Sequence, residues 1–456
     1  MTGTPVRLSE GNIYKQMLRI CIPLVAGSLM QQLYTIADSV IVGRFIGTSA
    51  LAATGACDPV INLLIGLLVG ISGGAGIAVS QAFGAKDAEQ LEMTVHTIIA
   101  YGIILGIIFT IVGVLTVPIW LTVMRLPEPV FGYADIYLRI YFSGTLFTMI
   151  YNMGASILNS VGNAVRALLF ASFSAVLNIF LAIFFIITLH MGIAGAALAT
   201  VISQLVSCVM IITDLIRTEE QYRLSIRKIR INGEVTGRIT KMGLSTGAQN
   251  IVRSVANMTV QTCVNMFGAA AIAGYAVFIR MDGIEWLVII SLTVAAQTFA
   301  GQNTGAGKYE RVRQGARVAI VIGGVYSAII SAIMIIFREP LSGAFTGDPE
   351  VIHYAILSMM HFAPFYVLFA AAQVLYGNVS GTGRTVQVLI IYTFAFCIFR
   401  IIWVLIAVTN VHTLTSVLRV YPFSWITGIV LMLIYMRRST WPQGVNNERI
   451  SGEKTE

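Results

Sequence analysis

The stretch IILGIIFTIVGVLTVPIW, Ile103–Trp120, carries no charged residue and is apolar on every face of a helix. Such a run predicts a transmembrane helix, because a helix needs roughly 20 apolar residues to cross a bilayer. A strand of a membrane β-barrel would alternate apolar and polar residues over about 10 positions. The stretch therefore favours an α-helical membrane protein over a barrel.

The composition of the whole chain agrees with that interpretation. Its 456 residues are 57% hydrophobic and only 11% charged, whereas a soluble domain has about 25% charged residues. A soluble protein of this length could not bury so much apolar surface in its own core. We predict twelve membrane spans, at residues 17–42, 51–79, 92–120, 131–156, 163–188, 192–214, 242–266, 271–299, 315–337, 351–376, 385–408 and 412–436.

The basic residues are distributed unevenly between the two sides of the membrane. If the N-terminus is cytoplasmic, 21 Lys and Arg residues fall in cytoplasmic segments and 3 in outer loops. This asymmetry is the positive-inside rule, and it predicts that both termini are cytoplasmic. The net charge of +8 is thus explained by topology, so we expect no nucleic-acid partner.

The two halves of the chain share motifs in the same order. A shift of 221 residues aligns three pairs, and a shift of 219 aligns a fourth. The pairs begin at Gly47 and Gly268, Gln81 and Gln302, Val130 and Val351, and Asn159 and Asn378. Six spans per half predict a parallel repeat about an axis along the membrane normal.

This repeat predicts the domain organisation. We expect an N-terminal six-helix bundle over residues 1–216, a basic cytoplasmic linker over 217–241, and a C-terminal six-helix bundle with a cytoplasmic tail over 242–456. Two such bundles that rock about a central cavity would give alternating access, which favours a transporter.

Ionisable residues inside membrane spans are functional candidates by default. Asp38 lies in the first span, with Gln31, Tyr34 and Thr35 on the same helix face. A buried carboxylate there could bind a proton, a metal cation or a cationic ligand in turn. Alternatively, Asp38 lies near the outer end of the span, six residues before Arg44, and is simply solvated.

Other polar residues in the spans have two interpretations. Asn178 and Thr200 could neighbour Asp38 or could simply join helices by hydrogen bonds. Asp282 and Glu285 share a helix face just after Arg280. That trio is either a coupling site or a structural cluster that neutralises itself.

An enzymatic alternative has little support in the sequence. Ser72 lies in a GxSxG pattern that resembles an intramembrane serine hydrolase, but a serine nucleophile needs a neighbouring base, and no histidine has that context. No nucleotide-binding or metal-ligand motif is found. We therefore predict a non-enzymatic protein without a cofactor, driven by a coupling ion if transport is active.

Taken jointly, several motifs resemble those of the multidrug and toxic compound extrusion (MATE) transporters. The similarity covers essentially the whole chain. The motifs are Pro23…Gln32…Asp38…Gly43…Gly47-x-x-Ala50-Leu51-Ala52-Ala53, Gln81…Gly84, Asn159-x-x-Gly162, Gly195-Ala196-Ala197-x-Ala199-Thr200 and Gln302-Asn303-x-Gly305-Ala306-Gly307.

The resemblance implies a function and a cellular location. It implies two six-helix bundles in a bacterial inner membrane that export small organic cations in exchange for H⁺ or Na⁺. The protein would be multi-pass, in contact with membrane lipids, and without an obligate protein partner. The main alternative function is that of a lipid or lipid-linked oligosaccharide flippase of related architecture. Intramembrane arginines such as Arg253 and Arg400 would suit the anionic phosphates of such a substrate.

The resemblance also implies roles for individual residues. Asp38 matches the first-helix aspartate used for ion coupling in the DinF-like branch, and Asn178 and Thr200 match polar residues around it. The second acidic residue of that site is Ala182 here. Arg253 and Ala370 replace the carboxylates of the NorM-like branch, so the chain is more similar to the DinF/MepA-like branch.

Organic cations need an adaptable, partly aromatic cavity, because methionine fits many shapes and aromatic faces attract cations. The predicted substrate-binding residues are Met30, Gln31, Tyr34, Met149, Tyr151, Met153, Phe278, Met281, Asp282 and Glu285.

Overall fold

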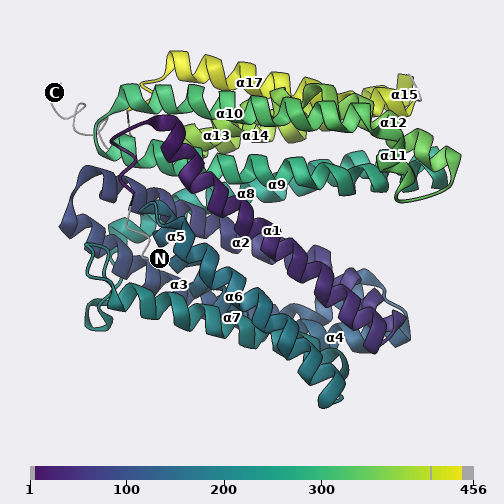
Figure 1. Cartoon of the computed structure of the whole chain (residues 1–456), viewed down its shortest axis with the longest axis horizontal. Helices are drawn as coiled ribbons and strands as arrows, with labels where there is room; N and C mark the ends of the chain where they lie inside the picture. Colours follow the sequence, from purple (N-terminus) through teal and green to yellow (C-terminus); the bar gives the residue numbers. More distant parts are fainter. Residues whose placement is uncertain (1–5, 411–412, 444–456) are drawn as a thin grey trace. The chain divides into compact units, whose positions relative to one another are not determined.

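A computed structural model of the chain describes residues 6–410 and 413–443, and within these ranges it contains helices and turns but no strand (Figure 1). The predicted all-α fold is confirmed. The first half consists of α1 (Ile13–Phe45), α2 (Thr48–Ala85), α3 (Ala88–Met124), α4 (Glu128–Ser143), α5 (Thr145–Ser160), α6 (Ala164–Ile183), the π-helical turn η1 (Phe184–Thr188) and α7 (Gly192–Arg217).

The second half follows a short 3-10 turn, η2 (Ile226–Lys228), and repeats the order with more interruptions. It consists of α8 (Gly233–Val264), η3 (Asn265–Phe267), α9 (Ala269–Gly305), α10 (Tyr309–Ile336), α11 (Arg338–Gly343), α12 (Pro349–Phe362), η4 (Ala363–Phe365), α13 (Tyr366–Gly381), α14 (Thr385–Thr393), η5 (Phe394–Ile398), α15 (Phe399–Asn410), α16 (Leu414–Leu418) and α17 (Val420–Arg438).

Each of the twelve predicted spans coincides with one helix or one interrupted helix. By length and hydropathy alone, nine helical segments in the described ranges could cross a membrane. The spans predicted at 131–156, 242–266 and 271–299 fall outside that set. The first of these divides at Gly144 into α4 and α5, which have 16 residues each. The tail beyond residue 443 and the start of the span at 412 lie outside the described residues.

Backbone conformation supports the internal repeat. Gly47 and Gly268 both have positive φ, at 121° and 95°, where they open α2 and α9. Glycine adopts this region without the clash that a Cβ would cause. Gly162 and Gly383 also share positive φ, at 81° and 91°. The conformational partner of Gly162 is therefore Gly383, at the common shift of 221, and the pairing with Gly381 at 219 was wrong.

The chain separates into two compact units. The first contains Ile22–Gly247, and the second contains Leu8–Cys21 with the chain from Ala248 onward. The beginning of α1 thus packs with the second unit, and the beginning of α8 packs with the first. Part of the predicted linker is helical, since α8 begins at Gly233. Its Val235 and Ile239 are buried in the core of the first unit, which explains the earlier helix start.

Glycines allow α8 to approach α2 closely within the first unit. A Cβ built on Gly70 would lie 2.3 Å from the Cα of Gly247, and one on Gly74 would lie 2.3 Å from the nitrogen of Gly243. The two helix backbones therefore touch. Gly70 and Gly74 are four positions apart on one helix face, the spacing of small residues that lets membrane helices pack closely.

Large apolar side chains remain exposed along the helices. On α3, Leu115 and Val123 are each 70% exposed and Ile119 is 61% exposed. A large apolar surface is unfavourable in water, whereas it is favourable against the hydrocarbon of lipid. The exposed residues of α3 thus belong to a surface that faces the hydrocarbon of a membrane.

Candidate functional site

The carboxylate of Asp38 lies in the first unit, on α1, and is partly buried. Its Oδ1 atom is buried and has no hydrogen-bond partner within the described part of the chain. Tyr34, one turn earlier on α1, is close enough to Asp38 to interact electrostatically with it. A buried carboxylate oxygen without a donor is unfavourable, so Asp38 has the capacity to take up a positively charged ligand or a proton.

Two of the residues predicted as neighbours of Asp38 are joined to each other by a hydrogen bond. The Asn178 amide on α6 donates to the hydroxyl of Thr200 on α7 at 3.2 Å, and both side chains are buried. Tyr34 is within hydrogen-bonding range of Thr200. The Asn178 Oδ1 atom is buried and unpartnered in the described residues. Tyr34 thus links Asp38 with Thr200 and, through it, with Asn178, and we call these four residues the α1 carboxylate site.

A second acidic residue, which the sequence did not single out, lies near this site. Asp58 on α2 is exposed and lies within electrostatic range of both Asp38 and Tyr34. It lies inside the predicted span 51–79, so the rule that singled out Asp38 would also have found it. At the position where the family resemblance leads us to expect the second acid, Ala182 is fully buried in an apolar core.

The predicted drug contacts occupy different environments. Met149, Met153 and Phe278 are fully buried in the packed cores of their units. Met281 is 8% exposed, and Tyr151 donates a hydrogen bond to the Ala167 carbonyl at 3.3 Å. Met30 and Tyr34 are half-buried and Gln31 is exposed. Contact between these side chains and a drug stays a prediction.

Asp282 and Glu285 lie inside the second unit on α9. The Tyr366 hydroxyl donates to Asp282 Oδ1 at 2.6 Å, and the Ser327 hydroxyl donates to Glu285 Oε1 at 2.5 Å. Arg280 is exposed and forms no ion pair with either acid among the described residues. The self-neutralising interpretation of this trio is therefore wrong, because Arg280 lies on another face of α9.

Ser72, the residue behind the hydrolase alternative, is buried on α2. Its hydroxyl donates to the Leu68 carbonyl one turn earlier, at 2.8 Å. A serine that hydrogen-bonds its own helix in this way is a common structural arrangement. The geometry does not resemble that of an activated nucleophile.

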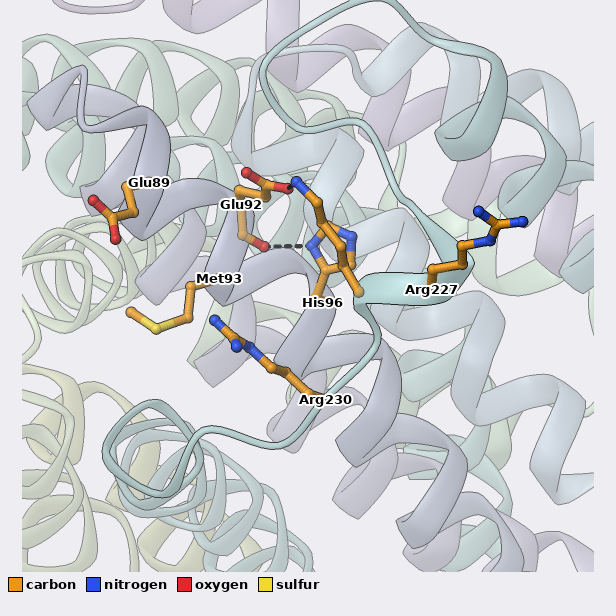
Figure 2. A pocket seen from close by; sticks show the side chains of 7 residues that line it. Glu89, Glu92, Met93, His96, Arg227 and Arg230 are labelled. Carbon is orange, nitrogen blue, oxygen red and sulfur yellow. Dashed lines mark hydrogen bonds and ion pairs between the residues drawn. The ribbon is translucent and has the colours of Figure 1, made fainter.

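A pocket of about 370 Å³ lies where the connection between the halves meets α3 in the first unit (Figure 2). It is lined by Glu89, Glu92, Met93, His96, Arg227, Lys228 and Arg230. Lys228 forms an ion pair with Glu92. His96 contacts the Glu92 carbonyl through Nδ1 at 2.6 Å and accepts the Ser225 N–H through Nε2 at 2.9 Å. The Lys228–Glu92 and Ser225–His96 contacts thus hold the segment between α7 and α8 against α3.

Replacing His96 with Ala should loosen this connection. The Ser225 N–H would lose its acceptor, at a cost of about 1–3 kcal/mol. We expect limited trypsin digestion to cut faster after Arg223, Arg227 and Lys228. Glu89→Gln is the control, because Glu89 lines the same pocket, has no hydrogen bond to the connection among the described residues, and leaves all three cleavage sites in place. Equal cleavage rates for wild type and His96→Ala would show that the histidine does not hold the segment.

Lipid-facing apolar helices with carboxylates such as that of Asp38 among them are typical of a polytopic membrane transporter. Within that class the chain belongs to the MatE family, whose sequence model matches residues 23–184 and 246–406. The two matched segments fall one in each half, as the internal repeat predicts. The family is one of transporters, so the chain is not an enzyme.

Several proteins are similar over most of their length. "Probable multidrug resistance protein YoeA" of Bacillus subtilis (strain 168) is 26% identical over 394 residues, 85% of each chain. "Multidrug export protein MepA" of Staphylococcus saprophyticus is 24% identical over 429 residues, 90% of this chain and 94% of that protein. The crystal structure of a MATE P26A mutant has a TM-score of 0.88 at 23% identity and covers all of both chains. That similarity shows the fold.

Proposed function

We propose that this protein is a secondary multidrug efflux antiporter that exports small organic cations in exchange for H⁺ or Na⁺ by alternating access. The observation that carries the proposal is the buried Oδ1 of Asp38, which has no hydrogen-bond partner among the described residues and lies near Tyr34. An anionic site of this kind can attract an organic cation and can be neutralised by an ion. The names of YoeA and MepA support multidrug compounds as the substrates.

The α1 carboxylate site is the proposed ion-coupling site. Drug would bind while Asp38 is ionised, and arrival of H⁺ or Na⁺ at Asp38 would cancel the attraction and release the drug outside. Coupling requires only that ion and drug compete for one conformational equilibrium. Asp58 would add negative potential to the same region. In this account the protein lies in a bacterial inner membrane with both termini in the cytoplasm.

A transport assay tests the proposal and identifies the ion. Purified protein in proteoliposomes is given ethidium, with either a pH gradient or a Na⁺ gradient imposed. We expect one of the two gradients to drive ethidium across the membrane against its own concentration gradient. If neither gradient moves ethidium, the export proposal is wrong. A separate assay with a fluorescent phospholipid would then test the flippase alternative.

A further inference from the structure

A row of polar side chains runs along α8 in the second unit, inside the span predicted at 242–266. Gln249, Arg253 and Asn257 follow one another at intervals of four residues, so they share one face of the helix. Gln249 and Arg253 are partly exposed, and Asn257 is exposed. A charged side chain is costly against hydrocarbon, so residues of this kind line a ligand site or a water-filled space. We call these three residues the α8 polar stripe.

The lipid-facing side of α8 is a different one. Ile251, Val255 and Met258 are exposed apolar side chains, and Met258 is 70% exposed. With 100° between successive residues of a helix, these three lie roughly opposite the α8 polar stripe. The stripe is therefore not part of the apolar surface that α8 offers to lipid.

Arg253 is a cation without an acidic partner. Its guanidinium lies over the ring of Trp286 on α9, 4.4 Å from the ring centroid. Among the described residues it forms no ion pair and no hydrogen bond. Stacking uses the flat face of the guanidinium and leaves the N–H groups at its edge free to donate. Arg253 therefore has both the charge and the donors that an oxyanion needs.

Asn257 is oriented to offer a donor as well. Its side chain accepts a hydrogen bond from Nη1 of Arg400 on α15 at 3.2 Å. Arginine can only donate, so the accepting atom is the amide oxygen, and the amide N–H₂ remains for a ligand. Arg400 is 3% exposed, and its Nε donates to the hydroxyl of Ser424 on α17 at 3.1 Å. It adds a second positive charge behind the stripe.

The third member of the stripe, Gln249, has a buried donor. Its Nε2 atom has no hydrogen-bond partner among the described residues, so an acceptor there would be favourable. The acids of the unit do not serve the stripe. Asp282 and Glu285 accept from hydroxyl groups, and neither forms an ion pair with Arg253 or Arg400 in the described ranges. The stripe thus has donors and positive charge but lacks an anion.

We propose that the α8 polar stripe is a binding site for the carboxylate of a small organic molecule. Arg253 binds the carboxylate by charge-assisted hydrogen bonds, and Asn257 donates from one turn later and Gln249 from one turn earlier. Arg400 contributes positive potential from behind. For an exporter, which rests on the proposed function, this site extends the substrates from organic cations to compounds that carry a carboxylate.

The position of the stripe favours a small molecule over a lipid headgroup. Residues 249–257 lie in the middle of the predicted span, whereas lipid phosphates lie at the two surfaces of the membrane. The stripe also lies on the side of α8 that is opposite its exposed apolar residues. A small organic anion can therefore reach it more directly than the headgroup of a lipid can.

Calorimetric titration tests the site without any transport. Purified full-length protein in phosphatidylcholine nanodiscs is titrated with naphthoate, with neutral naphthylmethanol and with cationic naphthylmethylammonium, which share one ring system. We expect Arg253→Gln to weaken naphthoate binding about tenfold or more, because hydrogen bonds to a charged group are lost. Binding of the other two compounds should not weaken. Arg338→Gln is the control, since it removes an exposed arginine of the same unit, at the start of α11.

Asn257→Asp gives an independent readout if Arg253→Gln does not fold. The new carboxylate keeps an acceptor for Arg400 but puts negative charge into the stripe, so naphthoate affinity should fall here too. Thermal unfolding establishes which variants are folded. Absence of naphthoate binding in wild type, or unchanged affinity in both folded variants, overturns the site.

Two further outcomes separate this site from its alternatives. If phosphatidylglycerol in the nanodiscs abolishes naphthoate binding, a lipid headgroup occupies the stripe and the small-molecule assignment is overturned. Equal naphthoate affinity in the two lipids supports the assignment. Naphthoate binding that depends on Arg253, in a protein that moves no ethidium, leaves the site standing and overturns only the antiport proposal.

Discussion

Asp38→Asn is expected to abolish ion-driven ethidium export while leaving the protein folded. Asn keeps the size of the side chain and one acceptor oxygen, but it cannot carry the charge that attracts an organic cation or bind the ion that releases it. A bound ion typically changes the affinity for a second ligand roughly 5- to 150-fold, which is a coupling free energy of about 1–3 kcal/mol. The variant should lose this difference in drug affinity between the ion-free and ion-bound protein, and export depends on that difference. The measurement is gradient-driven flux in proteoliposomes, wild type beside the variant.

Asp135→Asn is the matched control for charge removal. Asp135 lies on α4 of the same unit, and its carboxylate pairs with Arg139 at 2.9 Å on the exposed surface. An exposed pair contributes little to stability, about 0–1 kcal/mol. We expect flux in this variant to match wild type. Equal ion-driven flux in wild type and Asp38→Asn would remove Asp38 from the mechanism.

Gly74→Ala is expected to destabilise the first unit. The added Cβ would lie 2.3 Å from the nitrogen and 2.5 Å from the Cα of Gly243, which are backbone atoms and cannot rotate away. The helices α2 and α8 must then separate. Overpacking of this kind costs typically 1–3 kcal/mol. A lower midpoint of thermal unfolding in detergent, with less folded protein, is the expected result.

Gly55→Ala separates this clash from the effect of alanine itself. Gly55 lies on the same helix, α2, and a Cβ there would meet nothing within 4 Å. Alanine is a better helix former than glycine by about 1 kcal/mol, so this variant should be as stable as wild type or more so. If the Gly74→Ala and Gly55→Ala variants have the same midpoint of thermal unfolding, the close α2–α8 contact is not important for stability.

Hydropathy and repeated motifs were enough to predict most of the fold. Long apolar runs such as Ile103–Trp120 have one low-energy state in lipid, which is a helix, so the twelve spans could be located. The motif shift predicted the pairing of Gly47 with Gly268. The interruptions could not be predicted in the same way. The π-helical turns η1 and η5 occur in the fifth span of each half, and no local sequence signal precedes them.

The boundary between the two units also could not be predicted from sequence patterns. Residues 233–241 are polar enough to be taken as linker, but their Val235 and Ile239 are buried in the core of the first unit. Helix formation there depends on a surface that is distant in sequence. The close approach of Gly74 to Gly243 shows the same dependence.

The polar site was predicted in part. The intramembrane position of Asp38 singled it out. The structure places Tyr34 near both Asp38 and Thr200, and it joins Asn178 to Thr200. Asp58 was available to the same rule and was overlooked. Arg280 and Asp282 are two positions apart, and side chains at that spacing do not share a helix face, so the self-neutralising interpretation could have been rejected from the sequence.

Competition between ion and drug at Asp38 is the central claim, and equilibrium binding tests it most directly. The binding of ethidium to purified protein is followed by fluorescence while pH and then Na⁺ concentration are varied, for wild type and Asp38→Asn. The account predicts that one of the two ions displaces ethidium from wild type and has no such effect on the variant. Ethidium affinity in wild type that is indifferent to both ions, or displacement that persists in Asp38→Asn, would contradict it.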